Sequence, residues 1–203
     1  MAATQRDADP GGHAVWLVRH GETEWARLGR HTGRTDVPLT ETGRAQAIAL
    51  GVRLAGHPFD LVLTSPLSRA ADTAALAGFG DRAIVDPDLR EWDYGAFEGR
   101  LTTEIRAEYP GWTIWRGPWP DGETIDQVAA RADRVVARVR AAEGDALVVA
   151  HGHLLRVLAA RWLGLRPASG SLFALGTATV SILGWEREYP VIETWNEGSS
   201  DST

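Results

Sequence analysis

The sequence contains one short pattern twice: an apolar run that ends in a histidine followed by a glycine. The first copy is Leu17-Val18-Arg19-His20-Gly21 and the second is Val148-Val149-Ala150-His151-Gly152. Ligands of parallel α/β sheets bind outside the carboxyl ends of the strands, so two imidazoles at such ends can share one crevice. The glycines allow a tight turn and a close approach of the backbone to a ligand. The pattern predicts a ligand site between the ends of two buried strands.

A third apolar run, Leu61–Thr64, ends at Ser65-Pro66, which is typical of a helix N-cap followed by proline at the first helical position. Arg69 falls in the first turn of that helix, where a cation is unfavourable unless an anion lies nearby. Together with Arg19 it supplies two guanidinium forks, which match the oxygens of a phosphoryl group. Any one of these residues, taken alone, more often has a structural role than a ligand-binding one. Two histidines and two arginines at strand ends favour a phosphate site.

Short apolar runs alternate with helical patterns along most of the chain. The predicted strands are 14–18, 60–64, 83–85, 146–150, 180–183 and 191–194. The predicted helices are 40–55, 65–78, 124–142 and 154–163, and Thr124 to Gln127 forms a capping box. The apolar face predicted for the first helix consists of Ala45, Ile48, Ala49, Val52 and Ala55. This alternation predicts an α/β fold, a three-layer sandwich with a mostly parallel central sheet and helices on both faces.

The length of 203 residues suits one domain, which we expect over 14–195, with 1–13 and 196–203 as flexible tails. Hydrophobic residues make up 44% and charged residues 24%, a composition typical of a folded soluble protein. No apolar run reaches the roughly 18 residues of a membrane span, and the first residues lack a signal-peptide core. We therefore expect a cytoplasmic protein without a membrane partner; these features are compatible with a homodimer but do not decide the oligomeric state.

The chain contains neither cysteine nor lysine, and all 21 of its basic residues are arginine. The first absence excludes disulfides, thiolate zinc sites and a cysteine nucleophile. The second excludes a lysine Schiff base and a phosphate-binding lysine of the Walker or kinase type. A net charge of −6 disfavours nucleic acid as a partner, so anion binding requires a local pocket. We expect no metal and no cofactor.

Residues 111–122 do not fit the alternating pattern, because Trp112, Trp115 and Trp119 lie among two prolines and three glycines. The favoured interpretation is a surface excursion whose indoles cover the edge of the core. The alternative is a lid over an active site, since long loops on a rigid scaffold often carry function.

The residues around both histidines resemble the histidine phosphatase (phosphoglycerate mutase-like) superfamily. Residues 17–25, LVRHGETEW, are similar to its signature around the nucleophilic histidine. The likeness extends over about 14–185 and includes residues 29–42, 64–70, 89–95, 97–99 and 150–153. The stretches HTGRTDVPLT, LREWDYG and IWRGPWPDGET look most like the acid-phosphatase and sedoheptulose-bisphosphatase-like members, rather than the glycolytic mutases.

This resemblance implies roles for five residues. His20 is the nucleophile, and Arg19, Arg69 and His151 hold the three equatorial oxygens of the phosphoryl group. Glu91 is the general acid that protonates the leaving alkoxide and then deprotonates water. The residues alone do not select this carboxyl group, because several others compete: Glu22, Glu24, Asp93, Glu98 and Glu123. Aromatic neighbours of Glu91 in the sequence are compatible with its burial.

The resemblance also implies contacts with the substrate. Many members carry asparagine after the signature tryptophan, where its amide contacts phosphate; Ala26 stands here and removes one donor. Thr32, Gly33 and Gly152 are expected at the pocket mouth, and His31, Tyr94 and Arg156 toward the distal part of the substrate. Arg156 is either a grip for a second phosphate or carboxylate, or a solvated helix charge.

We therefore expect a metal-independent phosphatase that hydrolyses a small phosphorylated metabolite, with a sugar phosphate or bisphosphate preferred, through a phosphohistidine on His20. The alternative is a cofactor-dependent phosphoglycerate mutase, which would share the same catalytic residues. A mutase normally has a longer insertion with basic residues, whereas this chain offers only Arg116 there. The least favoured alternative is a non-catalytic module that binds phosphorylated ligands.

Overall fold

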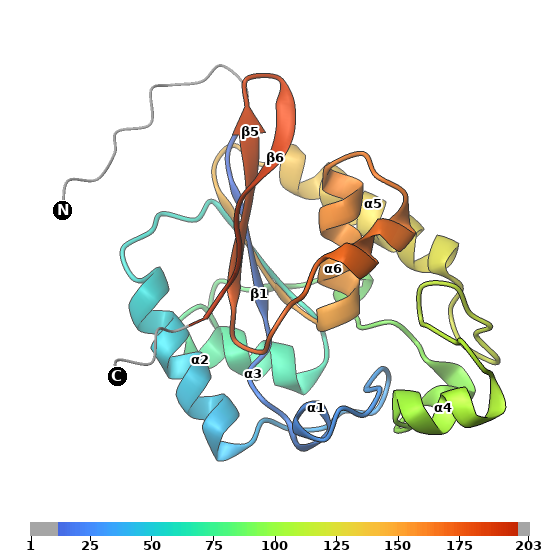
Figure 1. Cartoon of the computed structure of the whole chain (residues 1–203). Helices are drawn as coiled ribbons and strands as arrows, with labels where there is room; N and C mark the ends of the chain where they lie inside the picture. Colours follow the sequence, from blue (N-terminus) through green and yellow to red (C-terminus); the bar gives the residue numbers. More distant parts are fainter. Residues whose placement is uncertain (1–11, 199–203) are drawn as a thin grey trace.

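A six-stranded sheet runs through the centre of the computed structural model, which describes residues 12–198 (Figure 1). Its strands in spatial order are β3 (Ile84–Val85), β2 (Leu61–Thr64), β4 (Ala146–Ala150), β1 (Val15–Arg19), β5 (Val180–Glu186) and β6 (Tyr189–Glu197). The first four are parallel, while β5 and β6 are antiparallel to their neighbours. The predicted α/β fold with a mostly parallel sheet is confirmed.

The central strands β1, β2 and β4 are apolar because helices cover both of their faces. Every residue of β4 is buried. The register of β1 on β4 sets Arg19 opposite Ala150, so the two His-Gly pairs leave the sheet side by side. On the other side of β4, Thr64 of β2 lies opposite Val149. The ends of three strands therefore meet at one place.

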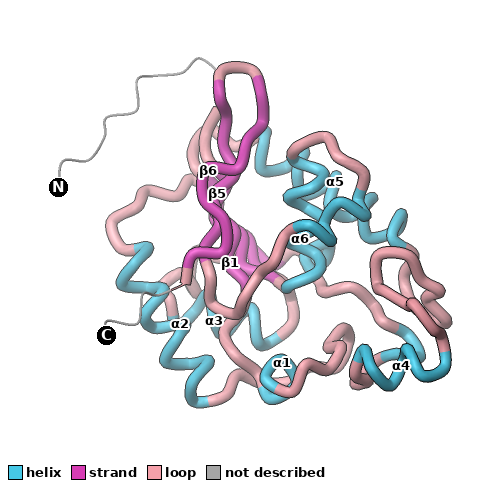
Figure 2. The backbone as a smooth tube through the Cα atoms, in the orientation of Figure 1, coloured by secondary structure: helices cyan, strands magenta, loops and turns pink. Residues whose placement is uncertain are grey.

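Two helices pack on each face of the sheet (Figure 2). On one face lie α2 (Glu41–Leu54) and α3 (Ser68–Leu76), and on the other α5 (Ile125–Arg140) and α6 (Gly152–Trp162). The shorter elements are α1 (Glu24–Arg27), α4 (Thr102–Glu108) and three 3₁₀ turns, η1 (Pro87–Leu89), η2 (Gly95–Phe97) and η3 (Pro167–Leu172). None of these described helices is long and apolar enough to cross a bilayer.

One helix start was predicted correctly and another was not. Thr124 accepts from the backbone N–H of Gln127, and the Gln127 side chain accepts from Thr124 N–H, which confirms the capping box of α5. The predicted N-cap at Ser65 is wrong, because α3 begins at Ser68. The Ser65 hydroxyl is hydrogen-bonded to His151 and accepts from the N–H of Leu67 just before the helix, and Asp36 accepts from the N–H and hydroxyl of Ser68.

The predicted apolar face of α2 is also wrong. The residues that α2 buries are Gly43, Ala47, Leu50 and Leu54, whereas Ala45, Ile48, Ala49, Val52 and Ala55 are exposed. Gly43 lies in close contact with the turn after β1, where a Cβ at Gly43 would collide with the carbonyl of Glu22. This contact sets Gly43 on the inner side, and Ala47, Leu50 and Leu54, which follow it at helical spacing, are buried with it.

The segment 111–122 packs onto the core. Trp112 is buried and donates to the Pro118 carbonyl, and Trp119 donates to the Ile114 carbonyl. The rings of Trp115 and Trp119 pack on Trp92. The favoured interpretation, in which the indoles cover the edge of the core, is confirmed.

The C-terminal hairpin is longer than predicted and projects from the sheet at the end opposite α1 (Figures 1 and 2). Strand β6 reaches Glu197, so Asn196 and Glu197 belong to the sheet rather than to the tail predicted from 196 onward. Asn196 accepts from Gly176 N–H and donates to the Ser181 hydroxyl through its backbone. Residues 1–11 and 199–203 of the two predicted tails lie outside the described residues.

The orientation of α2 gives a test by truncation. Leu54 is 1% exposed, so Leu54→Ala is expected to lower the free energy of unfolding by about 2–5 kcal/mol. Val52 is 78% exposed, so Val52→Ala is expected to change it by no more than about 0.5 kcal/mol. Urea denaturation of both variants measures the difference, and equal losses would contradict this orientation.

Candidate active site

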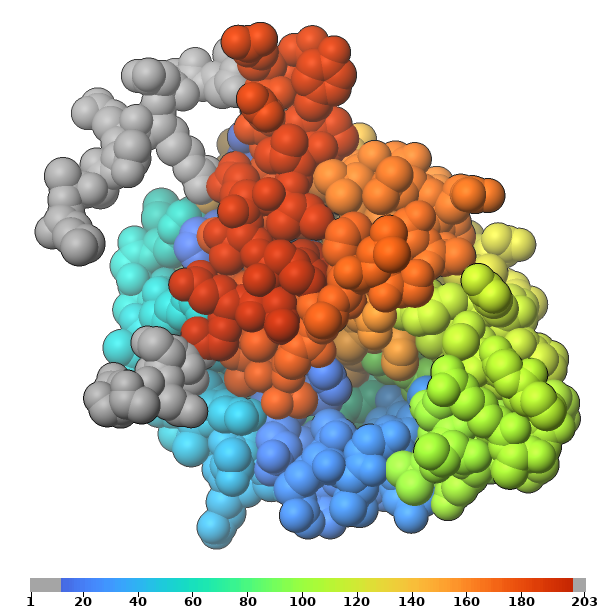
Figure 3. Space-filling view, in the orientation of Figure 1, coloured from blue at the N-terminus to red at the C-terminus, as the bar shows by residue number. Residues whose placement is uncertain are grey.

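A cavity of about 260 Å³ lies at the carboxyl end of β1, where His20 follows the strand. Figure 3 shows this face of the molecule hollowed between the blue segment after β1 and the yellow-green segment around α4. Most of the predicted site residues line the cavity: Arg19, His20, His31, Thr32, Glu91, Tyr94, Gly152 and Arg156. Ala26 lines it as well. Among the described lining residues, Glu91 is the one acidic side chain, which separates it from the competing carboxylates.

His20 is buried as a neutral imidazole with a defined tautomer. Its Nδ1 lies 2.7 Å from the Gly21 carbonyl, which can only accept, so Nδ1 carries the proton and Nε2 has a free lone pair. Burial lowers the pKa of His20 well below its usual value, and the charges of Arg19 and Arg69 lower it further. A neutral imidazole with a free Nε2 lone pair can act as a nucleophile at neutral pH.

His151 lies beside His20, with 5.1 Å between the ring centroids. The Arg69 Nε–H donates to His151 Nδ1 over 3.2 Å, so the proton of the neutral ring lies on Nε2 and is donated to Ser65 Oγ at 2.7 Å. Burial, followed by the charge of Arg69, lowers the pKa of His151 well below its usual value. Both ring nitrogens are therefore occupied within the protein, and the contact of His151 with a phosphoryl oxygen stays a prediction.

Arg69 is fully buried in the first turn of α3. Its Nη1 and Nη2 donate to the carbonyls of Thr32, Gly33 and Thr35 at 3.0–3.1 Å, which fixes the loop after α1. The N–H of Gly33 goes to Glu98 at 2.9 Å, and Gly33 lines a neighbouring cavity rather than the one around His20. Arg69 and His151 are therefore buried next to the cavity of His20 and do not line it, while Gly33 lines the neighbouring cavity.

Arg19 brings a second cation, half-buried, to the site. Its Nη1 donates to the Leu175 carbonyl at 2.6 Å, whereas its buried Nε–H has no hydrogen-bond partner among the described residues. A Cβ on Gly152 would lie 3.3 Å from the Arg19 guanidinium, so glycine at this position leaves room for it. A half-buried guanidinium with an unused donor favours an anionic ligand.

Glu91 is held by backbone donors from two directions. Its Oε1 accepts from the N–H of Trp92 and of Leu154, both at 2.9 Å, and its Oε2 accepts from His153 N–H at 3.0 Å. His153 and Leu154 lie in the first turn of α6, where free N–H groups and the helix dipole favour an acidic side chain. The expected burial of Glu91 is confirmed.

The wall farther from His20 carries neutral polar rings. The Tyr94 hydroxyl lies 2.6 Å from His153 Nδ1, and His31 packs against Tyr94 with ring centroids 4.8 Å apart. Burial lowers the pKa of His31 to about 4 and that of His153 well below its usual value, and it raises the pKa of Tyr94. Arg156 stacks on Trp115 and donates to the Gly170 carbonyl, so it is fixed in place rather than simply solvated. Its grip on a substrate anion stays a prediction.

Two residues of the site escaped the sequence analysis. Ser65 was interpreted as a helix cap, although it ends β2 as His20 and His151 end their strands, and that shared position is the signal that could have found it. His153 was left unassigned, and the structure places it on the cavity wall. No residue of 111–122 lines this cavity. Within residues 12–198, no group of three or more His, Asp or Glu side chains is arranged to hold a metal ion.

Comparison with known proteins identifies the family of the chain. The family model described as histidine phosphatase superfamily (branch 1) matches residues 15–198. An acid phosphatase of Mycobacterium tuberculosis is 45% identical over 178 residues, which cover 86% of this chain and 87% of that protein. A sedoheptulose 1,7-bisphosphatase of Saccharomyces cerevisiae is 40% identical over 182 residues, which cover 73% of this chain and 67% of that protein.

A solved structure of an open reading frame product of Mycobacterium tuberculosis has the same fold, with a TM-score of 0.87. It is 43% identical to this chain, and the match covers 92% of this chain and 98% of the other. The predicted resemblance to histidine phosphatases, and to their acid-phosphatase and bisphosphatase members, is confirmed.

The buried His31 predicts an acid-dependent loss of stability. In the unfolded chain this group titrates near 6.5, and in the folded chain near 4. Between these values the unfolded chain binds a proton that the folded chain does not, so stability is full above about pH 6.5 and falls as the pH drops toward 4. We expect His31→Asn to reduce the slope of unfolding free energy against pH in this window by about 1.4 kcal/mol per pH unit.

Urea denaturation of the wild type and His31→Asn at several pH values across this window measures the two slopes. Equal slopes would show that His31 does not remain neutral in the folded chain.

Proposed function

The chain belongs to the histidine phosphatase superfamily and is a phosphoric monoester hydrolase, and from this premise we propose that it hydrolyses a small phosphorylated metabolite through a phosphohistidine on His20. One observation carries the proposal: a buried, neutral imidazole with its Nδ1–H donated to Gly21 lies within the electrostatic influence of two arginines, Arg19 and Arg69. Among the described residues that line the cavity around it, Glu91 has the one carboxyl group. A nucleophile, cations for an anion and one acid–base group are thereby brought together.

In the first step the His20 Nε2 lone pair attacks phosphorus, and the bond to the leaving oxygen breaks. Negative charge in this transition state spreads over the three equatorial oxygens. The guanidinium of Arg19 lines the cavity, and its Nε–H has no hydrogen-bond partner among the described residues, so it is the proposed donor to these oxygens. Because Arg69 is buried and Arg19 is largely desolvated, their charges act with little screening by water.

An alkoxide leaves poorly unless it is protonated, and Glu91 is the carboxyl group in the cavity that can supply the proton. In the second step the resulting carboxylate takes a proton from water, whose oxygen attacks the phosphohistidine. The P–N bond breaks, inorganic phosphate leaves, and His20 and Glu91 return to their starting protonation states. No step in this sequence needs a metal ion or a cofactor.

The proposed substrate class is a sugar phosphate or bisphosphate. The wall beyond His20 presents the hydroxyl of Tyr94 and the imidazoles of His31 and His153, neutral groups that suit the hydroxyls of a sugar. Arg156, on the same wall, is the proposed contact for a second phosphate or a carboxylate. A cavity of about 260 Å³ fits a small metabolite.

Phosphate release from a panel of esters tests the proposal. The panel contains sedoheptulose and fructose bisphosphates, 3-phosphoglycerate and 4-nitrophenyl phosphate, all with a metal chelator present. We expect turnover by the wild type and a loss of at least about 1,000-fold for His20→Ala, because the nucleophile is gone. The matched control is His57→Gln, since His57 is paired with Asp145 outside the cavity; it should keep full activity.

Two outcomes would contradict the proposal. Conversion of 3-phosphoglycerate only after priming with 2,3-bisphosphoglycerate, without phosphate release, would indicate a mutase. Binding of the esters without either reaction would indicate a non-catalytic module.

A further inference from the structure

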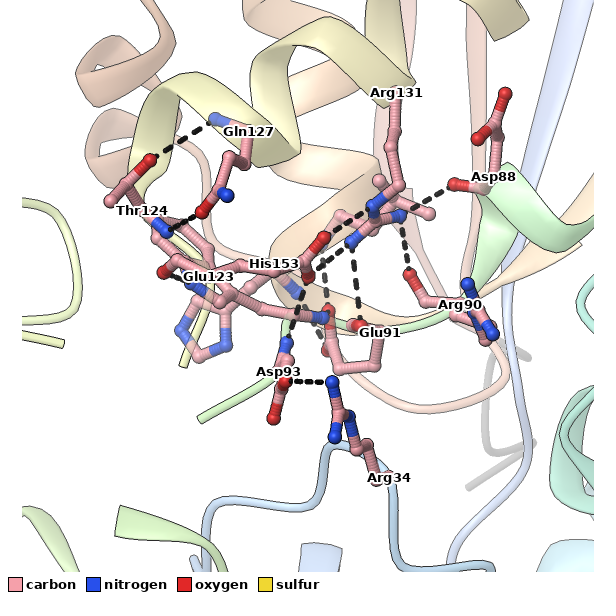
Figure 4. A network of polar contacts seen from close by, with 12 residues as sticks. Arg34, Asp88, Arg90, Glu91, Asp93, Glu123, Thr124, Gln127, Arg131 and His153 are labelled. Atoms are coloured by element: carbon pink, nitrogen blue, oxygen red, sulfur yellow. Dashed lines mark hydrogen bonds and ion pairs between the residues drawn. The ribbon is translucent and has the colours of Figure 1, made fainter. Parts of the chain in front are cut away.

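A largely buried ion pair between Arg131 and Glu123 lies next to Glu91, outside the cavity of His20 (Figure 4). Arg131 projects from α5, and its Nε and Nη2 each donate over 2.8 Å to the carboxylate of Glu123. Glu123 lies just before Thr124, the residue that caps the same helix. The side chain of Arg131 is 9% exposed and that of Glu123 is 24% exposed, so this is a forked contact largely removed from water.

The remaining donors of Arg131 reach the backbone that leads into Glu91. Its Nη1 donates to the carbonyl of Asp88 at 2.6 Å and to that of Arg90 at 2.9 Å. Its Nη2 approaches the carbonyl of Glu91 itself at 3.5 Å. One side chain therefore fixes three backbone positions on the N-terminal side of the carboxyl group.

Glu123 holds the backbone on the other side of Glu91. Its Oε2 accepts from Asp93 N–H at 3.0 Å, and its carbonyl accepts from the Trp92 indole N–H at 2.8 Å. Its own N–H donates to the Asp93 carbonyl at 3.0 Å. The segment 88–93 is thus gripped before and after residue 91 by the two partners of one ion pair.

We propose that Arg131 and Glu123 are positioning residues that hold the Glu91 carboxyl group in place for proton transfer to the leaving group, an inference that rests on the proposed role of Glu91. Neither residue lines the cavity of His20. Both line a second cavity of about 330 Å³ that also contains Glu91, so they reach the reaction only through that residue.

The cost of removing most of this ion pair from water supports this role. An ion pair taken out of water is on balance no more stabilising than an apolar pair of the same volume. A guanidinium fork adds fixed geometry, with five N–H groups in one plane. Burial raises the pKa of Glu123, but the hydrogen bonds and charge of Arg131 outweigh it and hold that pKa below its usual value, so the pair stays ionised. Displacing a catalytic group by 1 Å costs about 100-fold in rate.

Two phosphate esters that differ in their need for an acid provide the readout. Glycerol 2-phosphate releases an alkoxide, which needs a proton, whereas 4-nitrophenyl phosphate releases a phenolate that leaves without one. The ratio kcat/KM reports the steps up to departure of the leaving group and not the later hydrolysis of the phosphoenzyme. A fall in kcat/KM that is confined to the alkyl ester thus identifies impaired proton donation by the general acid. A loss of folded enzyme lowers kcat/KM for both esters.

We expect Arg131→Lys, which keeps the charge but not the fork, to lower kcat/KM for glycerol 2-phosphate by about 10- to 100-fold. For 4-nitrophenyl phosphate the loss should stay within about 3-fold. The double variant Arg131→Met/Glu123→Gln removes both charges, leaves no unpaired buried ion and should show the same pattern. The matched control is Arg134→Gln, because Arg134 contacts only the side chain of Asp88 at the surface; both esters should react as in the wild type.

Glu91→Gln separates the inference from the function on which it rests. It should lower kcat/KM for the alkyl ester by about 100- to 10,000-fold and for the aryl ester far less. The double variant Arg131→Lys/Glu91→Gln should show the same ratio of kcat/KM between the two esters as Glu91→Gln alone. Equal losses on both esters for Glu91→Gln would overturn the proposed acid. The expected pattern for Glu91→Gln with equal losses for Arg131→Lys would overturn the positioning role alone.

Discussion

The parallel pairing of β1 with β4 is the constraint on which the site depends. Pairing Arg19 with Ala150 brings His20 and His151 out of the sheet together, with their rings 5.1 Å apart. A shift of one residue would turn the side chains of β1 to the opposite faces, and His20 would no longer leave the sheet beside His151. Both strands are buried between two pairs of helices, so packing the core and aligning the imidazoles require the same register.

Burial at the carboxyl ends of β1 and β4 determines the protonation states of His20 and His151. The loss of water, together with the charges of Arg19 and Arg69, lowers the pKa values of His20 and His151 and keeps both rings neutral. The tautomers follow from neighbours that can only accept or only donate, the Gly21 carbonyl for His20 and the Arg69 guanidinium for His151. A free Nε2 on His20 is thus present before any ligand arrives, as electrostatic preorganisation requires.

The sequence allowed the sheet, most helices and most lining residues of the cavity to be predicted, because apolar runs that end in polar residues mark strand ends. It did not give the buried face of α2, since two apolar stripes compete there and the close contact of Gly43 with the Glu22 carbonyl, which no sequence pattern shows, selects between them. The bond of Ser65 to His151 was missed, because a serine at a strand end can cap a helix or bond a histidine. The pairing of Arg131 with Glu123 was equally hidden, because it depends on how α5 packs against the segment 88–93.

The two halves of the site are built differently, and this difference explains why one of them needs further support. Arg19, His20 and His151 continue from central strands, so the ladder of the sheet fixes their backbone. Glu91 lies between two 3₁₀ turns in a segment without a ladder, where few backbone bonds restrain position. Its carboxylate gains precision from the N–H groups at the start of α6, and its backbone from the ion pair of α5. The helices thus supply to the acid the rigidity that the sheet supplies to the nucleophile.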